Sequence, residues 1–84
     1  MYSVYVLYSP SHDEIYIGYS SDVDRRLAAH NHAMNSGYTK RYQPWELVFS
    51  EGFDQRSEAM RREQELKSAK GRAFIWEIIR NKYA

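Results

Sequence analysis

With 84 residues, the chain is long enough for one small domain with a single core, and we treat residues 1–84 as that domain. A composition of 43% hydrophobic and 27% charged residues with a net charge of +1 excludes a disordered chain, and neither a membrane-spanning segment nor a secretory signal is recognisable. Because cysteine is absent, a disulfide framework, a thiolate metal site and a cysteine nucleophile are excluded too, which fits a cytoplasmic location.

The first two elements are predicted to form a β-hairpin. Residues 2–9, YSVYVLYS, are rich in Val and Tyr and end at Pro10, which is typical of a strand that runs into a turn. Residues 14–19, EIYIGY, follow the turn-forming sequence PSHD. We therefore expect the second segment to pair back against the first.

A helix and a third strand are predicted next. Residues 20–34, SSDVDRRLAAHNHAM, begin with Ser21 or Asp22 as the helix cap, carry acidic residues in the first turn and end near NSG. Arg26 and His30 lie one turn apart in this helix, on or beside the side that should be packed. Residues 45–53, WELVFSEGF, alternate in polarity as a strand does.

The C-terminal part is predicted to be helical. Asp54 or Ser57 caps a helix over residues 55–70 that stops at Gly71, and residues 72–83 form a terminal helix. The apolar positions of the first helix are Ala59, Met60 and Leu66, and those of the second are Phe74, Ile75, Ile78 and Ile79. The fold class is therefore α+β, ordered ββαβα(α), with helices packed on a three-stranded antiparallel or mixed sheet.

Glu63 interrupts an apolar helix face, because it stands at helical spacing from Ala59 and Leu66. The ordinary explanation, which a single sequence favours, is an ion pair with Lys67 one turn later, worth a few tenths of a kcal/mol. The functional alternative is a ligand for a hard cation such as Mg²⁺, which needs only one or two carboxylates together with water and phosphate oxygens.

The other polar candidates also have two explanations. Arg26 either extends along the helix surface into solvent or contacts a phosphate. Tyr5 and Tyr16 are either core residues with satisfied hydroxyls or site residues, and Gly18 leaves space for a ligand or a backbone to come close. A zinc site is set aside, because His30 and the next histidine are two residues apart and do not face each other on a helix.

Charge is distributed unevenly along the chain. Residues 1–55 carry four Lys or Arg against seven Asp or Glu, whereas residues 56–84 carry eight against four. A basic C-terminal third fits a surface that binds a polyanion, although charged helices are most often simply solvated.

Taken together, these residues resemble the GIY-YIG nuclease superfamily, in its small stand-alone bacterial branch of predicted endonucleases. SVY, residues 3–5, stands in place of the GIY triplet, with Ser3 where the family pattern has its first glycine. YIG, residues 16–18, is intact, and Arg26 in DVDRRLAAHN and Glu63 in SEAMRRE follow in the same order. The resemblance covers almost the whole chain.

The resemblance implies a nuclease that hydrolyses phosphodiester bonds with a single divalent metal, Mg²⁺ or Mn²⁺. Glu63 would hold the metal, and Tyr5, assisted by Tyr16, would act as general base or orient the attacking water. Arg26 would neutralise phosphate charge, with His30 as proton carrier or phosphate contact. Because a free tyrosine has a pKa of about 10, Arg26 and the metal would have to lower the pKa of Tyr5 for it to act as a base.

DNA is the expected substrate, and no membrane partner is expected. The expected substrate contacts are Gly18, Lys40, Arg41, Lys67, Lys70 and Arg72. For so small a domain, either specificity is low, or a homodimer or a protein partner supplies it. Two alternatives remain open: a catalytically weak or inactive nucleic-acid-binding module, and a structural or interaction domain.

Overall fold

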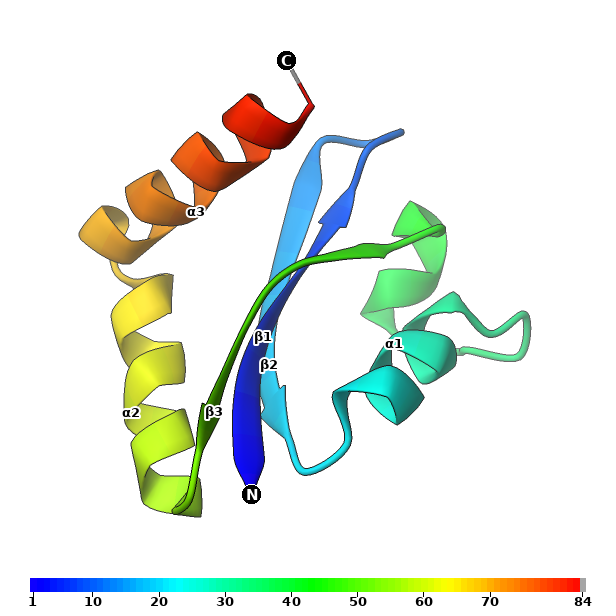
Figure 1. Cartoon of the computed structure of the whole chain (residues 1–84). Helices are drawn as coiled ribbons and strands as arrows, with labels where there is room; N and C mark the ends of the chain where they lie inside the picture. The colour runs from blue at the N-terminus through cyan, green and yellow to red at the C-terminus, as the bar shows by residue number, and fades with distance from the viewer. Residues whose placement is uncertain (84) are drawn as a thin grey trace.

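A computed structural model describes residues 1–83 as a three-stranded sheet with helices on both faces (Figure 1). The elements in chain order are β1 (Tyr2–Ser9), β2 (Glu14–Ser20), α1 (Val23–Asn31), the 3₁₀ helix η1 (Tyr38–Tyr42), β3 (Glu46–Phe53), α2 (Arg56–Lys67) and α3 (Ala69–Lys82). This confirms the predicted α+β class. Ala84, the last residue of the predicted domain, lies outside the described residues.

The sheet is antiparallel throughout, in the order β2-β1-β3. β1 is the central strand, with Tyr5 opposite Gly18 of β2 on one side and opposite Ser50 of β3 on the other. Its residues 4–9 are all buried, as expected for a strand with neighbours at both edges and helices on both faces. The prediction of a hairpin followed by a third strand is therefore confirmed.

Side chains alternate between the two faces of the sheet. Val4, Val6 and Tyr8 face α2 and α3, where they pack with Leu66, Ile75 and Ile79. Tyr5 and Leu7 point the other way, toward Trp45, with Tyr16 and residues of α1 packed beside them. The α1 face is the side on which the tyrosines of the hairpin gather.

Helix α1 is shorter than expected. Asp22 caps it by accepting from the Arg25 backbone N–H at 3.1 Å, but the helix ends at Asn31 and not near residue 34. The Asn31 side chain is bonded to the backbone of Trp45, donating to its carbonyl at 2.9 Å and accepting from its N–H at 2.6 Å. The chain then forms η1, which the sequence pattern did not indicate.

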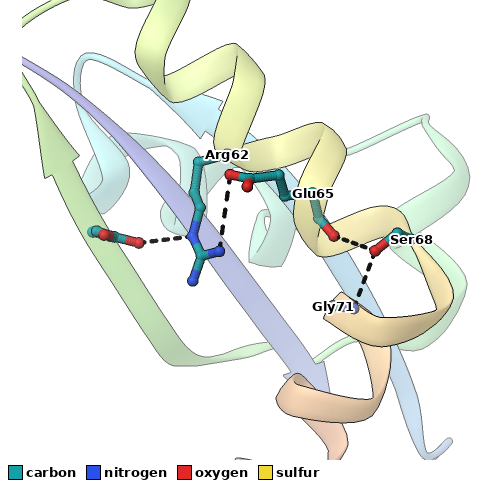
Figure 2. Close-up of polar contacts among 5 residues, drawn as sticks. Arg62, Glu65, Ser68 and Gly71 are labelled. Carbon is teal, nitrogen blue, oxygen red and sulfur yellow. Dashed lines mark hydrogen bonds and ion pairs between the residues drawn. The ribbon is translucent and has the colours of Figure 1, made fainter.

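The junction between α2 and α3 also differs from the prediction. Gln55, not Asp54 or Ser57, caps α2, in a reciprocal capping box with Glu58. The break falls at Ser68, whose hydroxyl donates to the Glu65 carbonyl at 2.6 Å and accepts from the Gly71 N–H at 3.1 Å (Figure 2). Gly71 therefore lies in the first turn of α3 instead of ending α2.

Two of the predicted apolar positions are not inward-facing. Met60 is 43% exposed, because Ala59 and Leu66 define the buried line of α2 and Met60 stands one residue round from it. Phe74 is similarly displaced from the line of Ile75 and Ile79. Its ring packs edge-on against the ring of Phe49, with the two centroids 5.7 Å apart. Among residues 1–83, no helix has both the length and the apolar character needed to cross a membrane.

Candidate active site

Tyr5 lies in the middle of the sheet with its ring across the neighbouring strand. Its side chain is 1% exposed, and a Cβ atom at Gly18 would lie 2.8 Å from Tyr5 Oη and 3.2 Å from Tyr16 Cε2. Gly18 therefore makes room for the Tyr5 ring. The space beside Gly18 is filled, and is not the open space for a ligand that the sequence suggested.

His30 joins the two tyrosines from the last turn of α1. Its Nε2 atom lies 3.3 Å from Tyr5 Oη, and its ring centroid lies 4.6 Å from that of Tyr16. The two tyrosine rings are 6.2 Å apart, centroid to centroid. Three of the predicted catalytic residues, from β1, β2 and α1, are thus in one cluster.

Arg26 approaches the same cluster from one turn earlier in α1. The residue is exposed, and both its hydrogen bonding and its charge act on Tyr5 and Tyr16, which raises the pKa of the guanidinium. An open pocket of about 310 Å³ lies here. It is lined by Tyr16, Arg26, Ala29, His30, Asn35, Gly37, Tyr38 and Thr39.

The electrostatics of the cluster differ from the expectation for Tyr5. Burial raises the pKa of Tyr5, and the hydrogen bond and charge of Arg26 lower it only in part, so the hydroxyl is protonated at neutral pH. Burial, and to a smaller extent Arg26, lowers the pKa of His30, so its ring is neutral at the same pH. Arg26 alone does not make Tyr5 a strong base.

Two residues that the sequence analysis did not select hold His30 in place. Thr39 Oγ1 lies 2.9 Å from His30 Nδ1, and the Asn35 amide donates to Thr39 Oγ1 at 2.9 Å and to the His30 carbonyl at 3.0 Å. Both lie in the segment between α1 and β3, whose sequence has no helical or strand periodicity by which they could be identified. A local signal was available, because an Asn two residues before a Gly is typical of a side-chain-capped turn.

Glu63 lies on α2 with its side chain only 14% exposed. Its carboxylate is 3.7 Å from Lys67 Nζ, so the ion pair expected on ordinary grounds is present. Its charge also acts on Tyr5, where it raises the pKa of the hydroxyl. Within residues 1–83 no three His, Asp or Glu side chains are grouped to hold a metal, so Glu63 would be the single carboxylate of a site completed by water and substrate oxygens, as Mg²⁺ allows.

The predicted basic contacts are exposed but do not form one patch. Lys40 and Arg41 belong to η1, which packs beside α1, whereas Lys70 and Arg72 begin α3 on the opposite side of the sheet (Figure 1). Lys67, near the end of α2, is paired with the candidate metal ligand. A nucleic acid that touched all five would have to pass around an edge of the sheet.

Comparisons with known proteins agree on the family. The family model described as the GIY-YIG catalytic domain matches residues 1–82. A UPF0213 protein of Halobacterium salinarum is 45% identical over 67 residues, 80% of this chain and 86% of the relative. A UPF0213 protein of Natronomonas pharaonis is 46% identical over 65 residues, 77% of this chain and 75% of the relative.

Two further relatives extend the comparison. A UPF0213 protein of Staphylococcus saprophyticus is 43% identical over 54 residues, and the match spans 64% of this chain and 66% of that relative. The solution NMR structure of a UPF0213 protein from Bacillus halodurans aligns with a TM-score of 0.53 at 33% identity. That alignment covers 93% of this chain and 85% of the solved one.

Proposed function

The chain belongs to the GIY-YIG catalytic domain family, a family of nucleases, and on that premise we propose that it is a metal-dependent endonuclease that hydrolyses phosphodiester bonds in DNA. The observation that carries the proposal is the cluster of Tyr5, Tyr16 and His30, in which Tyr5 Oη lies 3.3 Å from His30 Nε2, beside an open pocket lined by Tyr16, Arg26 and His30. A cytoplasmic location, favoured by the cysteine-free composition, completes the proposal.

Arg26 binds the phosphate that is cleaved. Its guanidinium is exposed, always charged and able to donate two parallel hydrogen bonds to phosphate oxygens. As negative charge develops on those oxygens, a charged donor already in position stabilises it at little reorganisation cost. Removal of Arg26 should therefore weaken both substrate binding and turnover.

Tyr5, assisted by Tyr16, orients the attacking water. As a neutral phenol, Tyr5 offers one hydrogen to donate and lone pairs to accept, which is sufficient to fix the direction of a water molecule. It removes a proton from that water only in the molecules in which the phenol has ionised. Arg26 increases that fraction and burial reduces it, so the proposed base is weak unless further positive charge comes near.

Glu63 is the residue that would hold the divalent metal, Mg²⁺ or Mn²⁺. When bound, such a cation stabilises charge on the phosphate and on the leaving oxygen. Lys67, released from its pairing with Glu63, joins Lys40, Arg41, Lys70 and Arg72 as contacts to the nucleic-acid backbone. Such contacts position a substrate without reading its sequence, so a homodimer or a protein partner would supply any high specificity.

A second candidate function is a nucleic-acid-binding module with little or no turnover. The ion pair between Glu63 and Lys67 at 3.7 Å favours it, and burial, which raises the pKa of Tyr5, is in keeping with it. A cleavage assay with Mg²⁺ or Mn²⁺ on duplex, single-stranded and branched DNA and RNA separates the two candidates. Metal-dependent cleavage supports the nuclease, whereas salt-sensitive binding without cleavage of any substrate supports the module.

A further inference from the structure

Tyr38 is the most exposed aromatic residue among residues 1–83, and the proposed mechanism gives it no role. It is 62% exposed, whereas the other two exposed aromatic residues, Phe74 and Tyr83, are 42% and 37% exposed. A single exposed ring on a protein surface needs no explanation in general. Tyr38 differs because it lines the open pocket of about 310 Å³ together with Arg26.

The ring of Tyr38 is held in place by its neighbours. Its centroid lies 5.2 Å from that of Tyr42, whose own centroid lies 6.0 Å from that of the buried Trp45. The next residue, Thr39, is buried, and its backbone carbonyl accepts a hydrogen bond from Trp45 Nε1 at 2.8 Å. Because the ring and its backbone are fixed in this way, a ligand that packs against Tyr38 pays little for ordering it.

The pocket suits a negatively charged ligand with a flat, aromatic part. Arg26 supplies a permanent positive charge, and no acidic side chain of residues 1–83 lines the pocket. One nucleotide unit of a nucleic acid has both features, a phosphate and a base. Inside a duplex the faces of a base are covered by its neighbours in the stack, so a base can reach an aromatic side chain only where it is unpaired or drawn out of the stack.

We propose that Tyr38 is a substrate-binding residue, on which an unpaired base next to the phosphate held by Arg26 stacks. This inference rests on the proposed function, in which Arg26 binds the cleaved phosphate, and it narrows the substrate to nucleic acid with an unpaired nucleotide at the site. Such stacking tolerates any sequence, because every base has a π face. Lys40, two residues later and exposed, carries a positive charge near the same strand.

Binding to two single strands in the presence of EDTA tests the role of Tyr38 without cleavage. One strand is an oligothymidylate, and the other has the same length and phosphates but abasic sugars. We expect the full chain to bind the thymidylate strand about 10-fold more tightly, as one stacked base would provide. Tyr38→Ala should bind both strands with the weaker affinity, whereas Tyr38→Phe, which keeps the ring, should behave as the parent does.

The matched control is Tyr83→Ala, which removes another exposed aromatic ring, at the end of α3 and outside the pocket. It should keep the parent's preference for the strand with bases. The proposal is overturned if the parent binds both strands equally or binds neither, if Tyr38→Ala keeps the preference, or if Tyr83→Ala loses it as well. Cleavage with Mg²⁺ is a separate measurement, so a chain that cleaves nothing contradicts the nuclease, and the binding result still decides the role of Tyr38.

Discussion

At Gly18 the backbone of β2 lies directly under the Tyr5 ring, with no room for a side chain. Gly18→Ala should push the ring away, because the new Cβ would stand 2.8 Å from Tyr5 Oη and 3.0 Å from Tyr5 Cζ. We expect a loss of about 1–3 kcal/mol in the free energy of unfolding, the usual range for an overpacked core. Urea unfolding measures it.

The matched control is Gly52→Ala. There a Cβ would meet Met1 Sδ at 3.0 Å, and Met1 is an exposed, flexible side chain that can move aside. If the Gly18→Ala chain is as stable as the Gly52→Ala chain, the position of the Tyr5 ring does not require a glycine at residue 18.

His30 should make stability depend on pH. Burial and Arg26 lower the pKa of His30 in the folded chain, so the unfolded chain binds more protons as pH falls below the ordinary value near 6.5. The contribution of His30 is therefore fully present above about pH 6.5 and is lost as pH falls through the folded pKa. Urea unfolding at several pH values should show this slope in the parent, and a smaller slope in His30→Gln. Equal slopes would contradict the assignment to His30.

The residues of the candidate site differ in how far the sequence could identify them. A family motif whose order can be seen in a single sequence identified Tyr5, Tyr16, Arg26 and Glu63. Thr39 and Asn35 belong to no such motif, because their contacts with His30 arise only when the segment after α1 folds back onto that residue. The glycine at residue 18 was visible in the sequence, but the physical reason for a glycine there was not, since the Tyr5 ring reaches it from the neighbouring strand.

At the scale of elements, the strands were predicted to within a residue of their bounds, because alternation and the turn residues between them are local signals. The helix ends were harder. The α1 terminus, the start of α2 and the α2–α3 break depend on side-chain bonds to backbone groups, made by Asn31, Gln55 and Ser68. The 3₁₀ helix η1 is too short for any period to mark it.

The α2–α3 junction gives a test at this scale. Gly71→Ala would bring a Cβ within 2.5 Å of the Leu66 Cα and onto the Glu65 carbonyl, and backbone atoms cannot move aside as side chains do. We expect a loss of about 1–3 kcal/mol in the free energy of unfolding, by overpacking. Ala73→Gly, at an exposed position of the same helix, is a control in which only helix propensity changes, by about 1 kcal/mol.

Two results would separate the explanations for Gly71. If Gly71→Ala stabilises the chain, as an alanine usually does inside a helix, the close contact between α2 and α3 at Gly71 does not limit the residue at this position. If instead both variants lose the same amount, propensity and not close packing governs the junction.

At the scale of the whole molecule, the net charge is only +1, and the proposed basic contacts belong to elements on both faces of the sheet, η1 beside α1 on one and α3 on the other. Binding to nucleic acid should therefore be weak, tolerant of sequence and steeply dependent on salt. Replacing both Lys40 and Arg41 by Gln should reduce the slope of log K against log salt by about 2, since each phosphate contact contributes about 0.9. Fluorescence anisotropy over a salt series measures the slope.

Arg80→Gln with Lys82→Gln is the control of equal charge change, at the exposed end of α3. We expect this control to keep the parent slope within error. Equal reductions in both double variants would mean that net charge alone governs binding. That outcome would remove Lys40 and Arg41 from the proposed interface.

The most direct test of the proposed nuclease compares Glu63→Gln with the parent for Mg²⁺-dependent cleavage, DNA binding and thermal unfolding in the same preparation. The substitution removes one negative charge with little change of shape. We predict that cleavage collapses while the folded chain persists and DNA affinity holds or rises slightly. Full cleavage by Glu63→Gln would contradict the metal role of Glu63. A loss of cleavage that is fully explained by a lower melting temperature would contradict the account of Glu63 as a catalytic residue.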